Sequence, residues 1–147
     1  MKTFSNTFSR TLTNTIAGLC LLGMSVFAHA QNVVVVSAKS SVGSMTKDQV
    51  ADIYLGNSKE FPGGGQALPL LPSSGGARVE FFEKVLGKNE AQAKAIWSRL
   101  VFSGKGSAPR EVADSSETVK LISANPNCIG VIEKSAVNSS VKVVFTP

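Results

Sequence analysis

The chain has 147 residues, of which 43% are hydrophobic, and it carries a formal net charge of +5. That length suits one domain with one hydrophobic core and leaves little room for a second. The basic excess is mild, and the lysines and arginines are neither clustered nor interleaved with aromatic residues, so we expect no nucleic-acid partner.

The first 30 residues have the three parts of a secretory signal peptide. Lys2 and Arg10 give a positive start without acidic residues, residues 16–27 are apolar, and Ala30 ends a segment of small residues that signal peptidase accepts. The apolar run is shorter than the ~20 residues of a membrane-spanning helix. We therefore expect cleavage near Ala30, a periplasmic domain of residues 31–147, and no membrane insertion after cleavage.

Cleavage changes which functional groups are left. It would remove His29 and Cys20, so the mature chain would keep no histidine and only one cysteine, Cys128. An internal disulfide, a Cys-His nucleophile pair and a His/Cys zinc site would then all be excluded. We expect a protein that is not an enzyme and that holds no metal and no cofactor.

The mature chain opens with a strand and a helix. Residues 33–36 are a continuous run of valine, which is typical of a strand buried on both faces. Thr46 and Gln49 then form a capping box, which predicts the start of a helix. Gly56 is expected to end that helix. Its apolar face consists of Val50, Ile53 and Tyr54.

A glycine-rich loop and a second strand–helix pair follow. Residues 61–65 lack the Gly-Lys-Ser/Thr ending of a phosphate loop, so we do not expect a nucleotide there. Residues 67–71 are predicted to form a short apolar strand. A helix is expected from about Ala77 to Leu86, closed by Gly87. Its predicted buried face is Val79, Phe82 and Leu86.

The third helix is the clearest of the predicted elements. Asn89 and Gln92 cap its start. Apolar residues follow at helical spacing, which indicates a buried stripe of Ala93, Ile96, Trp97 and Leu100. Residues 102–109 are predicted to form a surface loop.

The last third of the chain completes an α/β pattern. Asp114 and Glu117 form another capping box, which predicts a fourth helix. Residues 128–132 and 141–145 are predicted strands. Strands that alternate with helices indicate a central sheet flanked by about four helices in a single compact domain.

The start of the second helix differs from the other three. It lacks an acid or amide at the third position, so its free N–H groups can hold an anion. Gly75 and Gly76 allow a ligand to approach the backbone, Ser74 offers a hydroxyl, and Arg78 offers a guanidinium. We predict an oxyanion site of Ser74, Gly75, Gly76 and Arg78. In the alternative interpretation Ser74 is an ordinary N-cap, the glycines form a turn and Arg78 is solvated.

Three segments in this order resemble the phosphate-binding proteins of ABC transporters. They are Asp-Ile-Tyr-Leu-Gly at residues 52–56, Ser-Gly-Gly at residues 74–76, and residues 124–133. The family has an Ile-Phe-Leu-Gly-like helix end, a Ser-Gly-Thr helix start and a Pro-Gly-Ala-Ile-Gly-Tyr-Val-Glu segment. Here Gly76 stands in place of the Thr, and residues 70–72 hold Leu-Leu-Pro in place of the usual Arg and Asp.

The resemblance implies a periplasmic binding protein-like fold of the second type. The chain is much shorter than a two-lobed binder, so one lobe is expected to be reduced or absent. The resemblance also implies capture of phosphate or a similar small oxyanion without chemistry, with an ABC permease as partner. The alternative is an interaction module of the same fold whose ligand site is degenerate and which binds another envelope protein.

Overall fold

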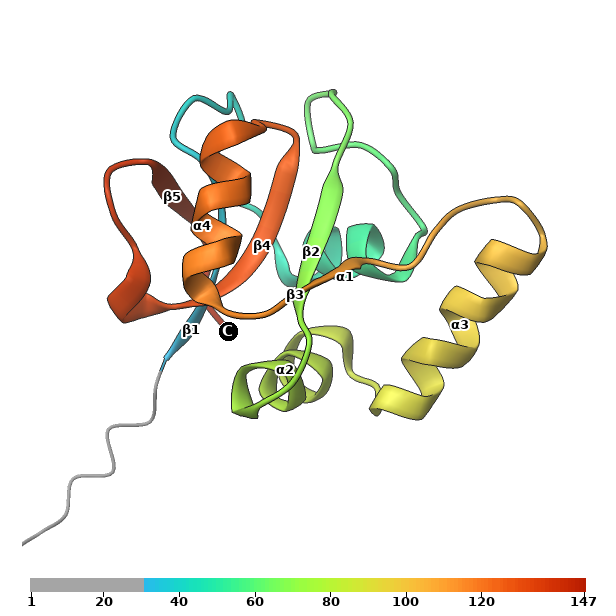
Figure 1. The fold of residues 1–147 in the computed structure, drawn as a ribbon. Helices are drawn as coiled ribbons and strands as arrows, with labels where there is room; N and C mark the ends of the chain where they lie inside the picture. Colours follow the sequence, from blue (N-terminus) through green and yellow to red (C-terminus); the bar gives the residue numbers. More distant parts are fainter. Residues whose placement is uncertain (1–30) are drawn as a thin grey trace, which may run out of the picture.

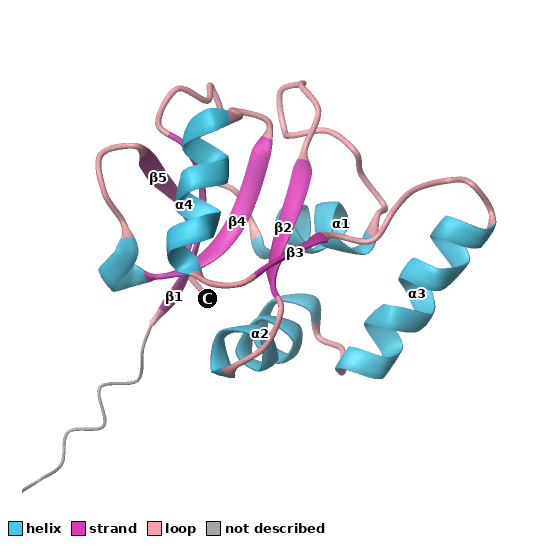
Figure 2. Ribbon diagram, in the orientation of Figure 1, coloured by secondary structure: helices cyan, strands magenta, loops and turns pink. Residues whose placement is uncertain are grey.

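A computed structural model describes residues 31–147, so the predicted signal peptide lies outside the described residues. The fold is a five-stranded mixed sheet in the order β3-β2-β4-β1-β5, with helices on both faces (Figures 1 and 2). β2 is parallel to β3 and β4, whereas β1 is antiparallel to β4 and β5. The strands are β1 (Asn32–Ser37), β2 (Leu68–Pro72), β3 (Arg110–Val112), β4 (Cys128–Glu133) and β5 (Val141–Phe145).

Four α-helices flank this sheet, which confirms the predicted α/β class. They are α1 (Lys47–Leu55), α2 (Gly76–Phe81), α3 (Glu90–Phe102) and α4 (Ser115–Ala124); α2 continues into a π-helical segment, η1 (Phe82–Leu86), and a short 3-10 segment, η2 (Lys134–Ala136), follows β4. None of the helices within residues 31–147 combines the length and the apolar character that crossing a membrane requires.

β1 divides the core into two clusters, because successive side chains of a strand point to opposite faces. Val34 and Val36 pack with residues of α1, α2, η1 and α3 on one face. Val33 and Val35 pack with residues of α4 on the other. All four valines are buried, as the continuous valine run predicted.

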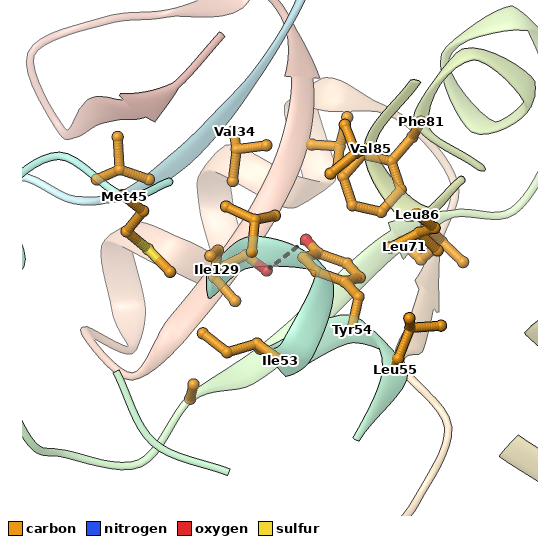
Figure 3. Packing of buried hydrophobic residues seen from close by; sticks show 14 of the residues in the cluster. Val34, Met45, Ile53, Tyr54, Leu55, Leu71, Phe81, Val85, Leu86 and Ile129 are labelled. Carbon is orange, nitrogen blue, oxygen red and sulfur yellow. Dashed lines mark hydrogen bonds between the residues drawn. The ribbon is translucent and has the colours of Figure 1, made fainter. Parts of the chain in front are cut away.

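α1 is fixed to the sheet through Tyr54. The capping box of Thr46 and Gln49 is present as predicted, and Gly56 ends the helix in the left-handed conformation at φ 79°. The buried Tyr54 hydroxyl donates to the Leu70 carbonyl at 2.9 Å and approaches the Ile129 carbonyl at 3.3 Å (Figure 3). Burial raises the pKa of Tyr54 well above 10.0, so this phenol stays a donor at neutral pH.

α4 lies directly on β4, where Gly130 allows a close approach. A Cβ at Gly130 would lie 2.4 Å from Thr118 Cγ2 and 3.0 Å from Ile122 Cδ1. Asp114 caps the helix as predicted by accepting from the Glu117 N–H. The Glu117 carboxylate, however, accepts from the Ala113 N–H, one residue before the position expected for a capping box.

Two of the three residues predicted for the buried face of the second helix are buried. Phe82 and Leu86 are enclosed as predicted, whereas Val79 is 54% exposed. Phe81 and Val85 complete the buried stripe, and Arg78 takes the inward position at its start. Because that inward position holds a charged residue, the apolar pattern alone did not indicate it.

The sequence interpretation missed one strand. β3 is three residues long and pairs with β2 at the edge of the sheet. So short a segment, with Arg110 and Glu111 in it, has no hydrophobic run that indicates a strand. Phe102, which was placed in a loop, is the last residue of α3.

Candidate functional site

The start of α2 lies at the edge of the sheet where β2 ends. The chain leaves β2 at Pro72 and turns through residues 73–75 into the helix. The Ser73 N–H donates to the Val112 carbonyl at 2.9 Å, which ties this turn to the end of β3. The carboxyl ends of parallel strands are where ligands usually bind in α/β sheets.

No side chain caps α2. The N-cap residue is Gly75, not Ser74, and it has φ 89° and ψ 177°, a backbone conformation that essentially only glycine adopts. In the other three α-helices of residues 31–147, the N-cap side chain accepts a backbone N–H. These caps are Thr46 from Gln49 at 3.2 Å, Asn89 from Gln92 at 2.9 Å and Asp114 from Glu117 at 2.8 Å.

The space in front of this helix start is open. Ser74, Gly75 and Gly76 are exposed, and a Cβ at either glycine would meet nothing within 4 Å. The six residues of α2 run directly into the five of η1, since Phe81 and Phe82 both have right-handed helical backbone angles. The first N–H groups of this continuous helix carry a partial positive charge, and no side chain caps them.

Arg78 does not face that space, so the structure does not bring its guanidinium together with residues 74–76. It is 3% exposed. Its Nη1 donates to the Pro72 carbonyl at 2.7 Å and lies 3.1 Å from Glu111 Oε1. Its Nε and Nη2 donate to Glu90 Oε1 at 3.2 and 2.9 Å. The alternative, a solvated Arg78, is also not what the structure shows, because the guanidinium is enclosed and lies 5.2 Å from the centre of the Phe82 ring.

The charge of Arg78 is therefore balanced within the protein. Glu90 also pairs with Lys94 at 2.8 Å. Hydrogen bonds from Lys94 and Arg78 lower the pKa of Glu90, so this carboxylate stays ionised at neutral pH. Two cations and two carboxylates make a neutral cluster. The positive potential at the start of α2 consequently comes from its backbone.

Asn32 is a buried polar residue at the same edge that sequence reasoning did not single out. β1 starts where β2 ends, because β1 is antiparallel and β2 parallel to β4. The Asn32 amide donates to Glu80 of α2, and its Oδ1 is buried without a hydrogen-bond partner among the described residues. An asparagine directly before four valines was the available signal. The contact fixes α2 against β1.

The structure thus brings three of the four predicted residues together. Ser74, Gly75 and Gly76 lie together at the open helix start, and Arg78 lies behind them. Within residues 31–147 there is no group of three histidine, cysteine or acidic side chains placed to hold a metal ion. The donors that the site offers are backbone N–H groups and one hydroxyl, which suit an oxyanion.

Comparison with known proteins identifies the fold. No protein-family model and no curated protein matches the sequence. Among solved structures, one that is similar is a putative phosphate ABC transporter substrate-binding protein from Clostridium perfringens with bound phosphate. The TM-score is 0.62 and the sequence identity is 22%, and the match covers 78% of this chain and 44% of that chain. The ABC-type phosphate transport receptor of Vibrio cholerae has a TM-score of 0.59 and 19% identity over 78% and 45% of the two chains.

PstS from Borrelia burgdorferi is similar at a TM-score of 0.56 and 16% identity, with 78% of this chain and 46% of that one covered. The fold is therefore periplasmic binding protein-like, as the resemblance implied. This chain spans less than half the length of each of these receptors.

Proposed function

We propose that the start of α2, residues 74–76, binds phosphate or a similar small oxyanion, and that the protein captures this ion without chemical conversion. The observation that carries the proposal is the uncapped helix start. In three α-helices of the domain the N-cap side chain accepts one N–H of the first turn, whereas α2, at the carboxyl end of β2, has no side-chain cap. Solved structures of the same fold include a protein with phosphate bound.

The expected affinity is modest. Hydrogen bonds from neutral N–H groups to a charged acceptor contribute about 1.5–3 kcal/mol each. Two of them give about 3–6 kcal/mol, which corresponds to a Kd between about 6 mM and about 0.04 mM. Arg78 adds no free charge, because Glu90 and Glu111 already neutralise it. In this proposal Arg78 positions the helix start, and Ser74, Gly75 and Gly76 make the contacts.

The proposal extends to the cellular setting. Residues 1–30 act as a signal peptide cleaved near Ala30, the mature protein is periplasmic, and an ABC permease receives the ion. The basis for export is the sequence pattern of the segment. The basis for an importer is the description of the similar solved proteins as ABC transporter receptors.

Gly76→Asp tests the site directly. A carboxylate at the first helical position would occupy the open N–H groups and repel an anion, while its interaction with the helix dipole would stabilise the fold by about 0.3–1 kcal/mol. We expect titration calorimetry of residues 31–147 with inorganic phosphate to show binding in the wild type and none in Gly76→Asp. Ser74→Ala should weaken binding several-fold by removing the hydroxyl.

Two control variants distinguish the effect of the substituted position from the effect of the added charge. Gly43→Asp introduces the same carboxylate at another exposed glycine with open space around it, and it should leave phosphate binding unchanged. Gly76→Asn adds a neutral side chain of nearly the same size and should retain weak binding. The proposal fails if wild-type protein gives no heat with about 10 mM phosphate, or if Gly76→Asp binds as the wild type does.

A further inference from the structure

α3 is held in one orientation by its inner face. The Trp97 Nε1–H donates to the Tyr54 carbonyl at 2.8 Å. Leu100 packs on Gly56, where a Cβ would lie 2.3 Å from Leu100 Cδ1, so only glycine leaves room. The Phe82 and Trp97 rings are 5.9 Å apart. The helix lies along the outside of the domain (Figure 1), and these contacts fix which residues point to solvent.

The outer side of its last turn is apolar. Val101 is 57% exposed and Phe102 is 95% exposed. A hollow of about 570 Å³ lies beside them. Its lining residues are Lys94, Trp97, Ser98, Val101, Phe102, Ala108, Pro109 and Glu111. A large aromatic side chain left in water next to an apolar hollow is typical of a protein-binding surface.

Two cations near this end of α3 have no acidic partner within residues 31–147. The charged residues that line the hollow, Lys94 and Glu111, are of opposite sign, and each is already paired, Lys94 with Glu90 and Glu111 with Arg78. Arg99 and Lys105, by contrast, form no ion pair with any residue from 31 to 147. Arg99 is three residues before Phe102 and so adjoins it on the helix surface. The Lys105 N–H donates to the Leu100 carbonyl at 3.0 Å, which turns the loop back beside the helix end.

We propose that the Val101–Phe102 end of α3 is a docking surface for an acidic amphipathic segment of another protein. An apolar side chain of that segment enters the hollow, and its carboxylates meet Arg99 and Lys105. A hollow takes a protruding side chain, which a protein segment has and a flat bilayer surface lacks. Two copies of this chain that met through the same face would bring like charges together. The observations that carry this surface are independent of the start of α2.

Trp97 provides the readout, because it is the only tryptophan of the chain and lines the hollow. The probe is a synthetic helical peptide with leucine and phenylalanine on one face and glutamate on the other, and its matched control carries lysine in place of each glutamate. We expect the acidic peptide to shift Trp97 fluorescence saturably at low salt and the basic peptide to leave it unchanged. Phe102→Ser should weaken the acidic peptide at least about tenfold, and Arg99→Gln with Lys105→Gln several-fold.

Val143→Ser is the matched control for Phe102→Ser, since Val143 is another exposed apolar residue, 43% exposed, on β5. It should leave peptide binding unchanged. Equal binding of both peptides, or no loss in Phe102→Ser, overturns the proposal. A Trp97 shift with phosphatidylglycerol vesicles but not with the acidic peptide would assign the surface to a membrane instead. Self-association in sedimentation that Phe102→Ser abolishes would assign it to a second copy.

Discussion

α2 and α4 begin at the same edge of the sheet, directly after the paired strands β2 and β3, yet their first turns are satisfied in opposite ways. In α4, Asp114 accepts the Glu117 N–H at 2.8 Å and Glu117 accepts the Ala113 N–H at 2.7 Å. In α2, the N-cap is a glycine and no side chain caps the helix. Two helices that start at the same edge of the sheet therefore differ at their first turn: side chains cap α4, and no side chain caps α2.

The side chain at the third helical position explains the difference. α1, α3 and α4 have Gln49, Gln92 and Glu117 there, and α2 has Arg78. A cation in the first turn opposes the helix dipole by about 0.3–1 kcal/mol when it is exposed. Arg78 instead points inward, where Glu90 and Glu111 neutralise it and the Pro72 carbonyl accepts from it. The start of α2 is thus anchored through the inward-pointing Arg78 and has no side-chain cap.

Arg78→Ala should have the largest effect on this arrangement. It leaves the buried Pro72 carbonyl without its donor, and it removes the guanidinium that lies over the Phe82 ring. We expect a loss of about 2–3 kcal/mol in the free energy of unfolding, since an unsatisfied buried acceptor alone costs about 1–3 kcal/mol. Urea denaturation of residues 31–147 measures it.

Arg99→Ala is the matched control for this loss. Arg99 is exposed on α3 and forms no ion pair within the described part of the chain, so its removal should change stability by no more than about 0.5 kcal/mol. If both arginines cost the same, the inward anchoring of α2 is not what holds its start.

The two adjacent glycines of α2 should respond differently to alanine. Both have room for a Cβ, but only Gly75 has a positive φ. Gly75→Ala should therefore cost about 1–3 kcal/mol of strain. Gly76→Ala should be neutral or slightly stabilising, because alanine favours a helix. Thermal unfolding compares the two variants, and equal effects would show that the start of α2 does not require the glycine-only conformation.

The sequence predicted those features of the helices that depend on neighbouring residues. The caps at Thr46, Asn89 and Asp114 are local patterns of three or four residues, and each is present. The inward orientation of the Arg78 side chain depends on its ion pairs with Glu90 and Glu111. These residues lie 12 and 33 positions away in the sequence, so only the folded chain brings them near. The same holds for β3, which is a strand because β2 lies beside it. Long-range contacts of this kind leave no periodic signal.

The smallest expected effect concerns the carboxylate behind α2. Hydrogen bonds from Lys94 and Arg78 lower the pKa of Glu90 below its ordinary 4.5, so Glu90 stabilises the fold above about pH 4.5. This contribution is lost as the pH falls through the lowered pKa, because the protonated group no longer pairs with Arg78. Glu90→Gln should thus be less stable than the wild type at pH 7.

The difference in urea midpoint between wild type and Glu90→Gln should shrink steadily as the pH falls below about 4.5. Glu83→Gln is the control, since Glu83 is exposed on η1 and forms no ion pair within residues 31–147. It should track the wild type at every pH. A difference for Glu90→Gln that stays constant with pH would mean that the side chain acts through packing rather than charge. Arg78 would then be anchored by Glu111 and the Pro72 carbonyl alone.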